Sequence, residues 1–505
     1  MRRLLIALVL GLPVPMVLPA TAGAASSLLD AASADDRPAA MQALDGGADV
    51  RAKLQDGTTA LHYAAHFGNL ELAQRLIKAG AVVDARNDYG STPMQEAAER
   101  GDAALVRVLL KAGADANTAN DEGETALMTV ARTGSVEAAK ALLKAHANVN
   151  AVEQWRGQTA LMWAAAQGNP EMVRLLIKSG AKVDTISSVR DWARKVTAEP
   201  RPQNRPPGGF TALLLAAREG CAPCAQELVK SGADINLATP ENITPLLMAI
   251  LNARFDTAKV LIQAGADVNR WDAWGRAPLY SAIDYNTTPR GGRPDRPSSD
   301  QVLPLEVAQM LLDRGANPNM QLKLFPPYRS LGQDRGGDAL LTVGTTPLLR
   351  AAKACDVPAT QLLLKRGAMA NLQNNLGATP LMAAAGVGWA TVDIRGRFRN
   401  EPPCIETAGL LLEAGADINA VNANGQTALH GAAQLGWTQV VRYLGGRGAK
   451  LDLKDGRGAT PLDIAMGRAG GTGRAGVAGA EAHPETAEAL RQLLAASPKP
   501  VAAAP

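Results

Sequence analysis

The sequence predicts an all-α solenoid in which about twelve helix-turn-helix units are joined by β-hairpin loops, with several loop insertions. One observation is a Thr-Pro/Ala-Leu tripeptide whose first four copies begin 33, 33 and 34 residues apart. Another is that an Ala-rich segment, a glycine and a Leu-rich segment follow most copies in the same order. A period in the low thirties is typical of stacked repeats, in which each unit packs against its neighbours. The eleven clear copies begin at Thr59, Thr92, Thr125, Thr159, Thr211, Thr244, Ala277, Thr346, Thr379, Thr427 and Thr460.

The first residues have the character of a secretory signal peptide. Arg2 and Arg3 precede an apolar run over residues 4–12, and Ala22-Gly23-Ala24 matches a small-x-small cleavage site. The apolar run is too short to span a bilayer. We therefore expect residues 1–24 to be removed after Ala24. The protein is then exported, either to the periplasm or out of the cell, with no membrane insertion.

Residues 26–53 predict a degenerate first unit in the same register. Ser26 lies 33 residues before Thr59, and the Leu and Ala residues that follow the two positions align. A terminal repeat differs from the others because its outer face meets water. The solenoid is therefore expected to cover residues 25–496, and residues 497–505 are expected to form a disordered tail.

The residues at the helix ends explain the order within each unit. The hydroxyl of a Thr such as Thr59 can accept a hydrogen bond from a free amide at a helix N-terminus. Pro suits the next position, because no amide donor is needed there. A first helix over residues 61–67 and a second from about Leu70 to Lys78 each end at a glycine, which adopts the left-handed conformation readily. Residues 83–90 are polar and contain glycine, so they predict an extended hairpin to the next unit.

One unit lacks the glycine after its second helix. His146 occupies the position that Gly80 and Gly113 occupy in the preceding units. His tolerates the left-handed conformation better than most residues but less well than Gly. We interpret His146 as local strain that the fold tolerates, without a functional role.

Three stretches carry a resemblance to a known family: Thr59–Ala65, Gly265–Asn269 and Asn424–Ala433. They match the pattern D-x-x-G-x-T-P-L-H-x-A-A-x-x-G and the G-A-D-V-N that follows the Leu-rich helix, so the units resemble ankyrin repeats. The resemblance implies a scaffold that binds protein partners through a concave groove lined by hairpin tips and first helices. It implies no particular activity, because the family shares a scaffold and not a chemistry.

Five segments interrupt the period, near residues 186–207, 287–302, 323–343, 390–403 and 468–482. They are rich in Pro, Gly and Arg and therefore predict loops. Insertions into a repeat array often mark its binding face. The alternative is drift, because lengthening a surface loop costs little free energy. We favour a functional interpretation, since several of these segments contain aromatic and Arg residues, the types enriched at interaction hot spots.

The candidate partner-binding residues lie at the hairpin tips and in the first helices. Trp155 and Trp274 are the main candidates, because a Trp at a hairpin tip has no packing role in the repeat. The alternative is that they pack beneath the insertions at 186–207 and 287–302. The complete set is Tyr89, Trp155, Arg156, Gln167, Phe210, Trp274, Arg276 and Tyr285.

The four cysteines suggest disulfides. Cys221 and Cys224 form a C-x-x-C at the start of a second helix, where a local disulfide is the default in an exported protein. A thiolate at a helix N-terminus is also reactive, so an envelope thiol-disulfide protein is the alternative function, although the βαβ context of a thioredoxin motif is absent. Cys355 and Cys404 fall near the helix-helix turns of adjacent units. Because such layers are about 10 Å apart, a bond between them requires the insertion at 390–403 to bend inward, and both outcomes stay open.

Composition and motifs narrow the function further. The net charge of +4, from 52 basic and 48 acidic residues, does not favour nucleic-acid binding. No catalytic, phosphate-binding or metal-binding motif appears, and His62 and His430 occupy the His of the repeat pattern, where a structural hydrogen bond is expected. We therefore expect a monomeric, non-enzymatic scaffold or adaptor without metal or cofactor, which binds a protein partner in the cell envelope.

Overall fold

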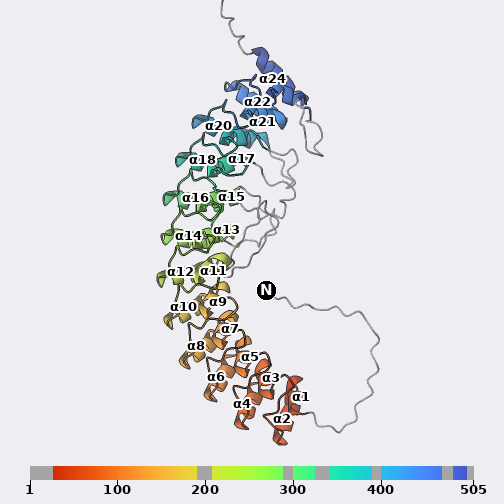
Figure 1. The fold of residues 1–505 in the computed structure, drawn as a ribbon, viewed down its shortest axis with the longest axis vertical. Coiled ribbons are helices and arrows are strands. Elements are labelled where there is room, and N and C mark those ends of the chain that lie inside the picture. Colours follow the sequence, from red (N-terminus) through yellow and green to blue (C-terminus); the bar gives the residue numbers. More distant parts are fainter. Residues whose placement is uncertain are drawn as a thin grey trace, which may run out of the picture. The chain divides into compact units, whose positions relative to one another are not determined.

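The computed structural model describes residues 27–189, 208–287, 300–324, 340–388, 400–468 and 481–496. Within these residues the chain forms 24 helices, which follow one another in pairs as the repeat predicts (Figure 1). The chain forms two compact units, one up to Asp121 and one from Glu122, and each is described by itself. The predicted signal peptide and the predicted C-terminal tail lie outside the described residues.

The first unit contains three helix pairs. The pair α1 and α2 falls within the predicted degenerate repeat, and the next two pairs carry the full pattern. The helices are α1 (Leu28–Ser33), α2 (Arg37–Asp45), α3 (Ala60–His66), α4 (Leu70–Lys78), α5 (Pro93–Glu99) and α6 (Ala103–Lys111).

The second unit continues the same alternation of first and second helices. Its helices are α7 (Ala126–Thr133), α8 (Val136–Lys144), α9 (Ala160–Ala166), α10 (Pro170–Lys178), α11 (Ala212–Glu219), α12 (Ala222–Lys230), α13 (Pro245–Leu251), α14 (Phe255–Gln263), α15 (Pro278–Asn286), α16 (Pro304–Asp313), α17 (Pro347–Lys353), α18 (Val357–Lys365), α19 (Pro380–Ala384), α20 (Glu401–Glu413), α21 (Ala428–Gln434), α22 (Thr438–Gly446), α23 (Pro461–Ala465) and α24 (Pro484–Ala496).

The helix ends are formed by the residues that the pattern predicts. The hydroxyl of Thr59 accepts the N–H of His62 at 3.4 Å, and the hydroxyl of Thr244 accepts the N–H of Leu247 at 3.2 Å. Pro occupies the first helical position of α5, α13, α15, α17, α19 and α23. His146 has a φ of 63°, which is the left-handed conformation predicted for it. Local chemistry therefore places both ends of most helices.

Residues 401–403 are helical, although the sequence places them in the loop at 390–403. α20 begins at Glu401, so Pro402 and Pro403 lie in its first turn. The amides of a first turn have no partner within the helix, and proline is therefore compatible with this position.

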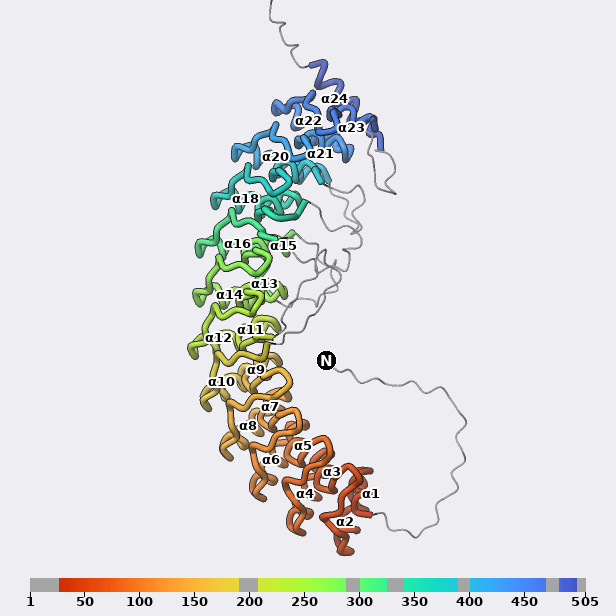
Figure 2. The backbone as a smooth tube through the Cα atoms, in the orientation of Figure 1, coloured from red at the N-terminus to blue at the C-terminus, as the bar shows by residue number. Residues whose placement is uncertain are grey.

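The loops between repeats, whose path Figure 2 traces, contain turns and no strand among the described residues, in contrast to the predicted β-hairpins. An isolated bridge pairs Lys53 with Thr59. In the second unit one or two backbone bonds join one loop tip to the next, as from the N–H of Ser188 to the carbonyl of Arg156 at 2.7 Å. These bonds do not continue along the loops, so no β-ladder forms.

A ladder of asparagine side chains joins repeats of the second unit near the turns that follow their second helices. Nδ2 of Asn269 donates to the carbonyl of Gly315 at 3.0 Å, and its Oδ1 accepts the N–H of Asn317 at 2.7 Å. Asn319 and Asn371 make the same pair of bonds to the repeats that follow them. Each amide thus satisfies one donor and one acceptor of the next repeat.

One rung in the first unit lacks the donor. Asp84 occupies the ladder position, and each of its oxygens accepts the N–H of Asp115 at 3.2 Å. Its carboxylate has no hydrogen with which to reach the carbonyl of Gly113, which is the group that corresponds to Gly315. Burial raises the pKa of Asp84, although the N–H of Asp115 opposes this shift.

We predict that Asp84→Asn stabilises the first unit by about 1 kcal/mol at pH 7, because the amide supplies the missing donor. A raised carboxyl pKa means that the folded state resists ionisation. The wild type therefore gains stability as the pH falls through the folded pKa, and the advantage of the variant shrinks there. Urea unfolding at pH 7 and pH 4 measures both effects, with Asp88→Asn, an exposed carboxylate, as the control for charge. Equal midpoints for the two variants at pH 7 would contradict this account.

Two buried histidines join a first helix to the loop of the next repeat. Nδ1 of His62 accepts the N–H of Thr59 at 3.2 Å, and Nε2 lies 3.1 Å from the carbonyl oxygen of Ser91. An amide only donates and a carbonyl only accepts, so the proton lies on Nε2 and the ring is neutral. His430 makes the same two kinds of contact in the second unit. The predicted structural role of both residues is confirmed.

The variant His62→Gln/His430→Gln is expected to lose less stability in mild acid than the wild type. Burial lowers the pKa of both rings below the ordinary 6.5, so the unfolded chain binds protons first. The stability from the neutral rings is therefore complete above about pH 6.5 and is lost as the pH falls towards the folded pKa. Gln fits this position, because Oε1 of Gln95 accepts the N–H of Thr92 at 3.2 Å in the repeat that follows His62. Urea midpoints at pH 7.5 and 5.5 test the expectation, which fails if both proteins lose stability equally.

Candidate protein-binding surface

The loop at residues 153–158 presents two of the predicted partner-binding side chains to solvent. Trp155 is 53% exposed, and Arg156 is also exposed. The buried carboxylate of Glu153 holds this loop by accepting the N–H groups of Trp155, Arg156 and Gln158 at 2.7, 2.8 and 2.8 Å. A side chain with three such bonds fixes the backbone that carries the indole.

An additional residue distinguishes this loop from the others. In a repeat of ordinary length the short Asp272 accepts the N–H groups of Trp274 and Arg276 at 3.0 and 2.9 Å. The Glu153 side chain is one methylene longer than that of Asp272. Glu153 lies six positions before the N-cap Thr159, whereas Asp272 lies five positions before the N-cap Ala277. The longer side chain therefore spans a longer tip.

Trp274 is buried, so the prediction of an exposed anchor is wrong at this position. Its side chain is 3% exposed, and the guanidinium of Arg276 lies 5.1 Å from the centroid of its ring. Arg276 is itself paired with Asp272 at 2.6 Å. The N–H groups of Lys323 and Leu324 both donate to the carbonyl of Trp274 at 3.0 Å. The start of the 323–343 insertion thus lies against this tip.

The remaining candidates divide between surface and packing. Tyr89 in the first unit is 74% exposed, and Gln167 in the second unit is exposed. Phe210 and Tyr285 are half-buried. The hydroxyl of Tyr285 donates to the carbonyl of Leu251 at 2.6 Å, which joins α15 to α13. Tyr285 is therefore a packing residue between repeats and not a free contact, contrary to the prediction.

Sequence reasoning missed a row of exposed apolar side chains along the loops of the second unit. Each stands directly before a buried polar residue of its loop, so all of them occupy the same place in their repeats. An apolar residue at this fixed position is the signal that could have revealed them. We call them the loop-edge row: Val152, Ile186, Trp271 and Val421, which are 48%, 52%, 45% and 50% exposed.

Two pairs of an Arg with an aromatic ring lie at the first helices α7, α9 and α11, with Phe210 in the loop directly before the N-cap of α11. The guanidinium of Arg132 lies 5.5 Å from the ring centroid of Trp163, and that of Arg218 lies 5.4 Å from the ring centroid of Phe210. Arg132 is exposed, whereas the other three side chains are half-buried. We call this group the open inner face. Trp and Arg are the residue types that contribute most to binding at protein interfaces.

The corresponding positions on α17 and α19 are covered by the chain itself. Leu340 and Leu341 are 3% and 6% exposed, and they cluster with Leu349 and Ala383 of these two helices. They belong to the 323–343 segment, which the sequence predicts to be a surface loop. Burying two leucines against the stack is favourable by several kcal/mol, on the order of 2 for each side chain. The end of the segment is therefore part of the core.

Charged groups are also buried at this covered part. Nε of Arg350 on α17 lies 2.6 Å from Oδ1 of Asp284 on α15, and the Arg350 side chain is 10% exposed. Nζ of Lys353 donates to the carbonyl of Gly388 at 3.3 Å. Buried cations with hydrogen-bonded partners hold neighbouring segments in one arrangement, so we assign them a structural role.

Two disulfides are present, and the pairing of Cys355 with Cys404 that the sequence left open is made. The Cα atoms of Cys221 and Cys224 are 5.2 Å apart, and those of Cys355 and Cys404 are 4.7 Å apart. Cys355 has a φ of 51°, which is the left-handed conformation of Gly220 at the equivalent position. With Cys404 near the start of α20, this conformation brings the two residues of adjacent repeats together.

Comparison with known families decides what the repeat is. The family model described as Ankyrin repeats (3 copies) matches residues 28–120, 97–187, 213–322 and 400–472. The model described as Ankyrin repeat matches residues 376–423. The chain belongs to the ankyrin-repeat family. No curated protein matches it in sequence. Ankyrin repeats generally mediate protein–protein interaction, and the exposed side chains of the loops and first helices are where such a contact can form.

The described part of this ankyrin-repeat chain contains neither a metal-binding cluster nor a membrane-spanning helix. No group of three or more His, Cys, Asp or Glu side chains there could hold a metal ion. No helix of the described ranges has the length and apolar character needed to cross a membrane.

Proposed function

We propose that this ankyrin-repeat protein is a monomeric, non-enzymatic adaptor that binds a protein partner in the cell envelope through the loop-edge row and the open inner face. The observation that carries the proposal is the loop-edge row, in which apolar side chains about half exposed recur at one position of the repeat. Exposed apolar groups that recur in register are a surface that a partner protein can cover.

The open inner face supports the same location for the partner. Arg132, Trp163 and Arg218 belong to α7, α9 and α11, and Phe210 directly precedes the N-cap of α11. The equivalent positions further along the second unit are occupied by Leu340 and Leu341. We therefore place the contact on the repeats from α7 to α14, where Trp155, Ile186 and Trp271 also lie.

The variant Trp155→Ala/Trp271→Ala is expected to bind its partner at least about 30-fold more weakly, since truncating a central Trp costs 2 kcal/mol or more. A photo-crosslinking amino acid at Ile186 captures the partner from an envelope fraction, and the purified pair is then measured by titration calorimetry. Met369→Ala is the matched control, because Met369 is 58% exposed but lies outside the loop-edge row. Unchanged affinity in the double variant would exclude Trp155 and the loop-edge residue Trp271 from the contact surface.

The envelope location rests on the signal-like segment at the N-terminus. A mature protein that begins at Ala25 and is recovered from the envelope fraction is the expected result. Recovery of a protein that keeps Met1 in the cytoplasmic fraction would contradict the envelope location.

A further inference from the structure

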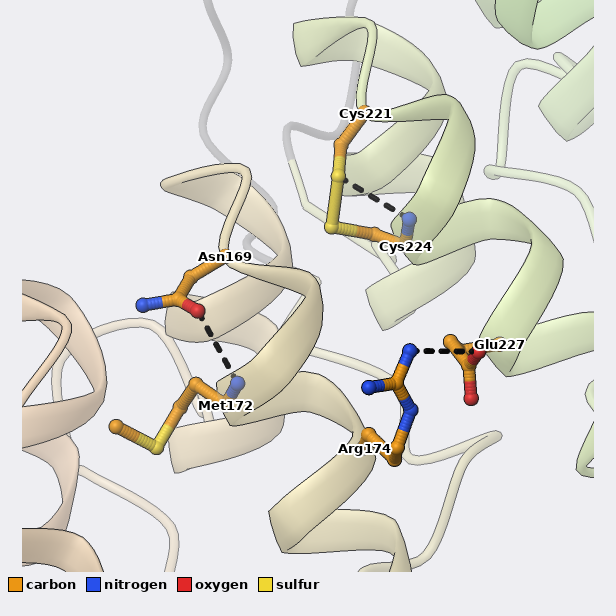
Figure 3. Close-up of a disulfide and its surroundings, with 6 residues drawn as sticks. All are labelled: Asn169, Met172, Arg174, Cys221, Cys224 and Glu227. Carbon is orange, nitrogen blue, oxygen red and sulfur yellow. Dashed lines mark hydrogen bonds and ion pairs between the residues drawn. A yellow bond between two sulfur atoms is a disulfide. The ribbon is translucent and has the colours of Figure 1, made fainter. Parts of the chain in front are cut away.

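The disulfide between Cys221 and Cys224 lies at the N-terminus of α12, where it takes the place of a helix cap. Sγ of Cys221 accepts the N–H of Cys224 at 3.1 Å (Figure 3). In the preceding repeat Oδ1 of Asn169 accepts the N–H of Met172 at 3.1 Å, in the same position relative to α10. The sulfur thus fills the role of the capping oxygen.

The repeat does not depend on this bond for its fold. The N–H of Cys224 faces Cys221 Sγ, and a thiolate at that position accepts a hydrogen bond at least as well as a disulfide sulfur. The packing of α12 rests on Ala225 and Leu228, which are fully buried. The two cysteines are only three residues apart, so the bond restricts the unfolded chain much less than the bond between Cys355 and Cys404 does.

The surroundings favour a thiolate on Cys221. The backbone N–H groups and the dipole of a nine-residue helix point towards its sulfur. A cation lies close by, because a Cβ on Gly220, the preceding residue, would be 3.1 Å from Nε of Arg254. Two further arginines near the turn are paired with carboxylates, Arg218 with Glu219 at 2.8 Å and Arg174 with Glu227 at 3.0 Å.

The two cysteines differ in the surface that they expose. Cys221 is 9% exposed, whereas Cys224 has no exposed surface. A thiolate from outside therefore meets Cys221 first, and Cys224 is the group that leaves.

We propose that Cys221 and Cys224 form a thiol-disulfide exchange site that oxidises a dithiol on a protein substrate. A substrate thiolate attacks Cys221 Sγ, the bond between the two cysteines breaks, and the electron pair leaves on Cys224 Sγ, which takes up a proton. The second substrate thiolate then attacks the substrate sulfur of the mixed disulfide and releases Cys221 as a thiolate. Two electrons pass from the substrate dithiol to the pair, and a second protein disulfide reoxidises the pair by the reverse steps. Stabilising the released thiolate makes the pair an oxidant.

The test begins with the wild-type full chain equilibrated in glutathione buffers of graded redox ratio. After acid quenching and alkylation, mass spectrometry reads the two cysteine pairs separately, and circular dichroism follows the fold. We expect the Cys221–Cys224 pair to be reduced at ratios that leave Cys355–Cys404 oxidised, with the helix signal unchanged. Reduction of both pairs together, or reduction only as the helix signal disappears, overturns the proposal.

A second measurement tests the thiolate directly. In Cys224→Ser the pH dependence of alkylation of Cys221 is expected to have its midpoint below about 7.5, against about 8.5 for an ordinary thiol. The wild type is expected to oxidise a reduced synthetic dithiol peptide in one turnover, and Cys221→Ser to leave the peptide reduced. An ordinary midpoint, or equal oxidation of the peptide by both proteins, overturns the proposal. None of these measurements involves the loop-edge row, so they leave the adaptor proposal untouched.

Discussion

Replacing Cys355 by Gly and Cys404 by Ala is expected to lower the free energy of unfolding of the repeats around α17 to α22 by about 4 kcal/mol. The disulfide joins residues 49 positions apart, and a cross-link that closes a loop of this length removes much of the freedom of the unfolded chain. Gly is the appropriate replacement at 355, because a φ of 51° costs it little. Urea unfolding followed by peptide-resolved hydrogen exchange measures the loss.

The control is the variant Cys221→Ser/Cys224→Ser. Its cysteines are three residues apart, and the same loop-closure relation gives about 2 kcal/mol. Hydrogen exchange should therefore show the larger loss of protection in the C-terminal repeats. If the two double variants lose the same stability, loop length is not what makes the second disulfide important.

Gly431→Ala is expected to destabilise the repeat of α21 by about 2 kcal/mol, although Gly→Ala in a helix usually stabilises. A Cβ at this position would lie 2.5 Å from the backbone nitrogen of Val387 and 3.0 Å from the carbonyl oxygen of Ala385. These are backbone atoms of the segment that follows α19, and they cannot move aside without displacing it. Thermal unfolding monitored by circular dichroism gives the size of the effect.

Gly446→Ala on α22 is the matched control for that variant. Apart from its two chain neighbours and the nearby backbone of its own helix, no heavy atom lies within 4 Å of the position that a Cβ on Gly446 would take. It is expected to be neutral or to stabilise by up to about 1 kcal/mol, as the higher helix propensity of Ala predicts. Changes of the same sign in the two variants would show that the close approach of Val387 does not matter.

Most of the fold could be predicted because its signals are local. Thr59 caps a helix through an amide three residues away, and His146 adopts its unusual φ at the end of its own helix. The ring of His62 bonds the residues beside it and the next loop, at a separation that the period defines. Since the Thr cap recurs in most repeats, one unit that is interpreted correctly predicts the positions of the others.

The candidate site could be predicted only in part, because exposure at a loop tip depends on what the next segment does. Trp155 and Trp274 occupy similar tips, yet one is 53% exposed and the other 3%. At Trp274 the guanidinium of Arg276 lies over the ring, and the N–H groups of Lys323 and Leu324, at the start of an insertion, donate to the carbonyl of Trp274. Trp271 was missed although an apolar side chain recurs at its position in several repeats.

The period and the capping residues were sufficient to establish an ankyrin-repeat stack, the positions of its helices and the left-handed turn at His146. Contacts between segments far apart in the chain established the rest: the burial of Trp274 and Leu340, the exposure of the loop-edge row and the bond between Cys355 and Cys404. The physical reason is the range of the interactions. A helix cap is complete within a few residues, whereas burial and cross-linking depend on inserted segments whose path no local pattern encodes.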